Sequence, residues 1–144
     1  MAQMAKEKGL EAFALTEHAP QMPGTCHEFY FQNLHIVPRE MYGVRLLMGV
    51  ELNIMNEKGE VDLPESTLCQ MDIAIASIHG PCYKGERTEE AITAAYLAAM
   101  ENPLIHIIGH PDDGRYPVDY EQLAKKAKET GTVLEVNNGS LRPG

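Results

Sequence analysis

The sequence predicts a single α/β domain, part of a TIM-like barrel in which mostly parallel strands alternate with helices. Short apolar runs recur along the chain, with helical segments between them. The runs are continuous rather than alternating, which is typical of parallel strands that are covered on both faces. Four of the runs end in a His or a Glu, at steps of 33, 28 and 31 residues. One strand–helix unit of a barrel takes roughly 31 residues, so the steps match successive units.

The five expected strands are apolar runs that end in turn residues or polar side chains. They cover residues 11–16, 45–54, 73–78, 104–109 and 133–136. The sequence Asn56-Glu57-Lys58-Gly59 is typical of a tight turn, so a short hairpin is expected to return through residues 60–62.

Helical segments are expected between these strands. They cover residues 1–8, a segment that begins at residue 28, a short stretch at 64–70, and two longer helices that follow Thr88 and Asp119. Thr and Asp are residue types that cap helix N-termini. Gly9 and Gly131 are stop signals for the first and last helices, and Pro38 limits the second.

The composition excludes several classes of function. The net charge is −9, from 21 acidic and 12 basic residues, which disfavours nucleic-acid binding because that depends on Lys and Arg at phosphates. The sequence predicts no membrane span and no signal peptide, since no apolar run approaches the length of a spanning helix. Three cysteines without a CxxC pair fit a reducing compartment, so a cytoplasmic location is expected.

Four side chains at the ends of successive runs are the candidate metal ligands: His18, Glu51, His79 and His110. Side chains at the C-terminal ends of barrel strands face one site, so we expect them to converge there. Imidazole nitrogens and a carboxylate suit Zn²⁺, Mn²⁺ or Fe²⁺, and a carboxylate can bridge two ions. The structural alternative is that Glu51 is satisfied by hydrogen bonds and that the histidines are ordinary core or loop residues.

Other residues with metal-binding chemistry are interpreted as bystanders. His106 is expected to pack or hydrogen-bond within a strand, His27 and His35 to lie in a loop and on a helix, and Cys82 to remain a reduced thiol. Asp112 and Asp113 follow His110 and are expected in a solvated turn, with a role in holding metal or substrate as the alternative.

The strand ends resemble the motifs of the PHP (polymerase and histidinol phosphatase) superfamily. Thr16-Glu17-His18 looks like its "T-D-H" strand end, and Gly49-Val50-Glu51 resembles its "G-x-E" motif. Ser77-Ile78-His79-Gly80 and Ile108-Gly109-His110-Pro111 are similar to its third and fourth motifs. Glu135-Val136-Asn137-Asn138 resembles the "E-x-N-N-S" strand of the phosphatase branch, which includes YcdX-like and histidinol-phosphatase-like proteins.

The resemblance implies a distorted (β/α)₇ barrel with divalent metals, often Zn, Mn or Fe, at the C-terminal strand ends. It implies that Glu51 bridges two ions, that His79 and His110 complete one of those sites, and that His18 binds a third ion. The implied reaction is hydrolysis of a small phosphomonoester by a metal-activated water. The catalytic and substrate-binding residues themselves are not assigned.

The family's opening H-x-H and closing D-x-H motifs have no counterpart in these residues. The chain is therefore expected to be a central fragment, residues 1–144, that lacks the first strand and the C-terminal units of the barrel and has weak or no activity on its own. Its two open sheet edges predict a homo-oligomer. The alternatives are another metal-dependent barrel hydrolase, such as an amidohydrolase, and a noncatalytic PHP-like binding or structural module.

Overall fold

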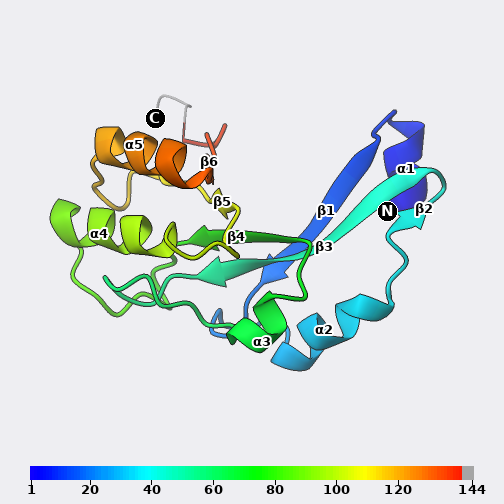
Figure 1. Cartoon of the computed structure of the whole chain (residues 1–144), viewed down its shortest axis with the longest axis horizontal. Coiled ribbons are helices and arrows are strands. Elements are labelled where there is room, and N and C mark those ends of the chain that lie inside the picture. Colours follow the sequence, from blue (N-terminus) through cyan, green and yellow to red (C-terminus); the bar gives the residue numbers. More distant parts are fainter. Residues whose placement is uncertain (141–144) are drawn as a thin grey trace.

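The computed structural model of the 144-residue chain describes residues 1–140. Its centre is one sheet in the order β1-β3-β4-β5-β6, with β2 beside β3 (Figure 1). All neighbours on the main path are parallel, and only β2 is antiparallel. Parallel strands that are adjacent both in sequence and in space are the arrangement of a barrel segment. The predicted α/β fold, with mostly parallel strands alternating with helices, is confirmed.

The strands span Ala12–His18 (β1), Glu40–Met41 (β2), Val44–Asn53 (β3), Ile73–Ser77 (β4), Ile107–Ile108 (β5) and Val133–Leu134 (β6). The helices span Ala2–Glu7 (α1), Glu28–Asn33 (α2), Glu65–Leu68 (α3), Glu89–Ala99 (α4) and Tyr120–Thr130 (α5), with a 3₁₀ turn at Leu34–Ile36. The long helices α4 and α5 pack side by side (Figure 1).

The helix boundaries follow their predicted caps. The Thr88 side chain accepts a hydrogen bond from Ala91 N at 3.2 Å, and the Asp119 side chain accepts one from Gln122 N at 3.0 Å. These bonds satisfy amide groups that have no partner inside the helix. Gly131 ends α5 in a left-handed conformation, with φ of 78°. Here local sequence chemistry alone sets where both long helices start and where the last one stops.

The structure adds one strand to the expected elements and shortens two others. The segment after residue 28 is helical only at its start, as expected, but its end forms strand β2, which was not predicted and is joined to β3 by a tight turn in which Tyr42 and Gly43 both have positive φ. The expected hairpin after β3 is present in short form, as one antiparallel bridge between Ile54 and Val61. The last two strands have only two residues each, fewer than the expected runs at 104–109 and 133–136.

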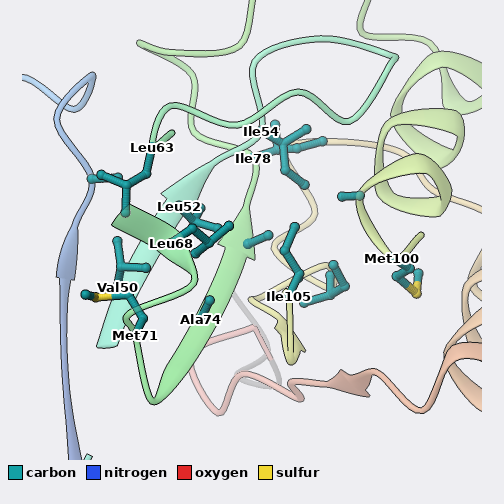
Figure 2. Packing of buried hydrophobic residues seen from close by; sticks show 14 of the residues in the cluster. Val50, Leu52, Ile54, Leu63, Leu68, Met71, Ala74, Ile78, Met100 and Ile105 are labelled. Carbon is teal, nitrogen blue, oxygen red and sulfur yellow. The ribbon is translucent and has the colours of Figure 1, made fainter. Parts of the chain in front are cut away.

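The core lies on one face of β3 and β4. Val50, Leu52 and Ile54 of β3 are all fully buried. Figure 2 shows this row beside Leu63 and Leu68, from the segment that leads into and through α3. Alternate residues of a strand point to opposite faces, so Glu51 and Asn53 point away from this row. The strand that anchors the core therefore also presents polar groups to the site.

Within residues 1–140, every helix is too short to cross a bilayer.

Candidate metal centre

The register of the sheet brings three candidate ligands to one end. His18 of β1 lies directly opposite Glu51 of β3. Asn53 of β3 lies opposite Ser77 of β4, and His79 follows Ser77 by two residues on the same strand face. Parallel pairing places the C-terminal strand ends together, which is why residues distant in sequence meet here.

Glu51 is the centre of the cluster. Its Oε1 atom lies 3.3 Å from His79 Nε2 and 3.3 Å from His110 Nε2, while its Oε2 atom lies 3.4 Å from His18 Nδ1. The ligand atoms of His18, Glu51 and His79 all lie within 4.8 Å of one another. The structure therefore brings the three predicted histidines to the Glu51 carboxylate, with His79 and His110 at one oxygen and His18 at the other.

His110 reaches this position through an unusual backbone. Its φ is 34°, a region that few residues with a side chain occupy. Its backbone N–H donates to Glu135 Oε2 at 2.7 Å, which ties the end of β5 to the segment after β6. The preceding Gly109 packs against Ser77 and Ile75, where a Cβ would overlap both side chains. Backbone strain held in place by surrounding contacts is concentrated at functional sites.

His79 is oriented from behind by a chain of hydrogen bonds. His79 Nδ1 lies 2.7 Å from Asn53 Oδ1, and Asn53 Nδ2 lies 2.6 Å from Asp62 Oδ2. A carboxylate only accepts hydrogen bonds, so the Asn53 amide must turn its NH₂ to Asp62 and its oxygen to His79. Nδ1 of His79 therefore donates to Asn53 Oδ1, which leaves Nε2 facing Glu51.

Two backbone amides hold the Asp62 carboxylate in place. Its Oδ1 accepts from Asn53 N at 2.8 Å, and its Oδ2 accepts from Gln21 N at 2.9 Å. The single bridge between Ile54 and Val61 places this aspartate beside β3. The short hairpin after β3 thus supports the candidate ligand His79 from the far side of the ring.

The electrostatics of Glu51 combine opposing effects. Burial alone would raise its pKa, but the adjoining His110 and His79 rings, the Ser77 hydroxyl at 2.9 Å and the nearby His18 together lower the pKa well below its usual range. Glu51 in turn raises the pKa of His110, against the opposite effect of burial. Glu51 is therefore an anion at neutral pH that attracts a cation.

The donor set fits a divalent metal. Two ligands bound at about 2.1 Å to a tetrahedral ion lie about 3.4 Å apart, which the three nitrogen–oxygen separations at Glu51 match. Within the described residues, the buried Nδ1 atom of His18, which faces Glu51, has no hydrogen-bond partner. His79 Nε2 lies 3.3 Å from a carboxylate oxygen of Glu51, a pair that either a proton on the ring or a metal cation holds together. The positions of these atoms therefore suit the ligands of a metal.

The residues interpreted as bystanders take structural roles. His27 caps α2 by accepting from Phe29 N at 3.2 Å, and His106 accepts from Ala74 N at 3.1 Å. His35 Nδ1 lies 2.6 Å from Gln32 O on an exposed helix face. Cys82 is buried, which raises the pKa of its thiol and leaves it less reactive. None of these side chains reaches Glu51 by a hydrogen bond or ion pair within residues 1–140.

The solvated turn expected at Asp112 and Asp113 is wrong. Asp112 Oδ2 accepts from Asn137 N at 3.0 Å, and Asp113 forms an ion pair with Arg115. The Asp113 Oδ2 atom that pairs with Arg115 also lies 3.8 Å from His110 Nδ1. The Asp112 hydrogen bond joins the loops after β5 and β6, a contact that a sequence pattern does not reveal.

Four functional neighbours were not assigned from sequence: Ser77, Asn53, Asp62 and Glu135. Ser77 and Asn53 stand two residues from His79 and Glu51 on their own strands. The period of two along a strand could have found them. Asp62 and Glu135 come from a hairpin and from the end of another strand, so only the folded chain brings them to the site.

The sequence is similar to a known protein family and to several curated proteins. The sequence profile described as "PHP domain" matches residues 1–141. The chain belongs to the PHP family. A probable phosphatase of Caldanaerobacter subterraneus is 45 % identical to this PHP chain over 140 residues, covering 97 % of the chain and 55 % of the relative. A probable phosphatase of Clostridium novyi is 45 % identical over 141 residues, covering 98 % of the chain and 57 % of the relative.

This PHP chain spans a little over half of the length of these curated relatives. The sheet described above is consistent with part of a TIM-like PHP barrel, because its parallel strands follow one another in sequence order.

Proposed function

We propose that this chain is the central part of a PHP barrel and carries part of the active site of a metal-dependent phosphoesterase. The observation that carries the proposal is the division of Glu51: one oxygen faces His79 and His110, and the other faces His18. A carboxylate in this arrangement suits two neighbouring cations. The family match favours this reading over another type of barrel hydrolase.

The four candidate ligands would bind two metal ions. Glu51, His79 and His110 would hold one divalent ion, Zn, Mn or Fe, and His18 with the second oxygen of Glu51 would hold another. A bound divalent ion supplies Lewis acidity, which lowers the pKa of water and offsets charge on phosphate oxygens. The substrate class is a small phosphomonoester.

The chain's own residues set the geometry of the site. Asn53 fixes the ring of His79 so that Nε2 faces Glu51, and Ser77 fixes one carboxylate oxygen of Glu51. Glu135 holds the backbone of His110 in its strained conformation. Ligands that are oriented before the metal arrives bind it more tightly, because no ordering is needed afterwards.

The test is the variant Glu51→Gln, which keeps the size of the side chain and removes its charge. Metal content after dialysis should fall, and metal affinity should weaken by more than about tenfold. In a full-length version of the protein, hydrolysis of p-nitrophenyl phosphate should fall in parallel. Glu40→Gln is the matched control, since Glu40 is exposed on β2 and pairs with the N-terminal end of β3. Retention of both metal and activity in Glu51→Gln would exclude the proposed site.

A further inference from the structure

Two loops place cationic and aromatic groups beside the metal centre. Arg87 lies in the loop between β4 and α4, while Arg115 and Tyr116 lie in the loop between β5 and α5. The two guanidinium carbons lie 5.7 Å and 6.0 Å from the centre of the Tyr116 ring. Both loops follow a candidate ligand directly, so this group of three side chains adjoins the site.

Arg87 is anchored next to His79. Its Nη2 atom donates to Gly80 O at 3.3 Å, and Gly80 is the residue after His79. The absence of a side chain at Gly80 lets the Tyr116 ring approach, because a Cβ there would lie 3.1 Å from the Tyr116 hydroxyl. Tyr116 is buried, so the guanidinium rests on a fixed ring.

The charge of Arg87 is not balanced by an ion pair. Arg39 lies 2.6 Å from Asp72, and Arg115 pairs with Asp113. Arg87 has no carboxylate within 4.0 Å among residues 1–140. A planar guanidinium that is oriented but not paired is suited to bind a carboxylate or phosphate through two hydrogen bonds. In a chain of net charge −9, such a group gives an anion a local point of attraction.

We propose that Arg87, supported by Tyr116 and Arg115, binds a second anionic group on the substrate, at a distance from the phosphoryl group that reacts. This subsite rests on the proposed function, since it assigns the substrate class of the same site. The reacting phosphoryl group would lie at the ions proposed at Glu51, whereas the hydrogen bond from Arg87 to Gly80 O holds the guanidinium in the loop after His79. The preferred substrate is a phosphomonoester whose alcohol carries a carboxylate or another phosphate.

Phosphoserine and phosphoethanolamine provide the test, because they differ only in a carboxylate. Binding of each to the metal-loaded chain is measured by calorimetry, and phosphate release is measured in parallel. The chain should bind phosphoserine about tenfold more tightly than phosphoethanolamine, as expected for one charge-assisted pair. Arg87→Gln should remove this preference and Arg87→Lys should retain part of it, because a lysine keeps the charge but not the planar fork.

Arg45→Gln is the matched control, since Arg45 is an exposed arginine near the N-terminal end of β3, the end away from Glu51. It should keep the full preference. Equal binding of the two ligands, no binding of either, or a preference that survives in Arg87→Gln would overturn the subsite. Hydrolysis of both ligands without any preference would refute the subsite and leave the phosphoesterase proposal standing. A preference that depends on Arg87, without hydrolysis of either ligand by a full-length version of the protein, would support the subsite and count against the phosphoesterase.

Discussion

Replacement of Asn53 by Ala is expected to weaken metal binding without touching a metal ligand. Asn53 is fully buried between His79 and Asp62, at 2.7 Å from one and 2.6 Å from the other. In Asn53→Ala the ring of His79 loses its only fixed partner at Nδ1 and can rotate or change tautomer. Loss of such an outer partner typically costs about 10–100-fold in metal affinity.

The cost in stability can be worked out from the same contacts. Each buried polar group that loses its partner costs about 1–3 kcal/mol. Asp62 keeps two backbone donors, from Asn53 and Gln21, so most of the cost falls on His79. The free energy of unfolding should therefore fall by about 2–4 kcal/mol, which includes the small cavity left by the amide.

Two measurements separate the effects. Urea unfolding of the metal-free chain gives the stability loss, and competition with a chelator for Zn²⁺ gives the affinity loss. Asn33→Ala is the matched control, because Asn33 donates to Phe29 O on the exposed end of α2, away from the site. A stability loss in Asn53→Ala with zinc affinity unchanged within about twofold would refute the reasoning, since an oriented ligand should contribute more than that.

Three further outcomes are expected. Gly109→Ala should lower both the zinc affinity and the free energy of unfolding, because the Cβ of the new alanine would displace Ser77 from Glu51. An unchanged zinc affinity in a chelator competition would contradict this. The 144-residue chain alone should hydrolyse p-nitrophenyl phosphate far below ordinary enzyme rates of about 1–10³ s⁻¹, because it contains no H-x-H or D-x-H motif; turnover in that range would show this to be wrong. Sedimentation should detect a homodimer that forms through β1 or β6, because each of these strands is paired on one side only within residues 1–140. The exposed Val136 follows β6, so Val136→Lys should shift the equilibrium toward the monomer. A stable monomer of the unsubstituted chain at micromolar concentration would contradict this.

The sequence was sufficient where short-range chemistry decides the structure. The caps at Thr88 and Asp119 and the stop at Gly131 depend on groups within a few residues, and all three are confirmed. The convergence of Glu51 with the three histidines followed from strand order, since the ends of parallel neighbours meet at one edge. That these residues bind metal stays a prediction.

The sequence was insufficient where loops from different units meet. Asp113 was expected in solvent because a turn of polar residues is usually solvated, yet it lies between Arg115 and His110. Strand β2 was missed because its turn needs a left-handed Tyr42, which no propensity predicts for an aromatic residue. Both errors concern backbone paths that tertiary contacts select rather than local preference.

The negative net charge of the chain has opposite effects on the two kinds of ligand proposed for the site, metal cations and a phosphorylated substrate. A net charge of −9 favours the approach of cations to Glu51, whose own pKa is lowered by its neighbours. The same charge would repel a phosphorylated substrate unless bound ions reversed the local field. An uncompensated Arg87 next to His79 would extend that reversal outward from the ions. In the proposed site, the ions and the arginine would act as one electrostatic unit, in which the ions bind the reacting group and the arginine selects what is attached to it.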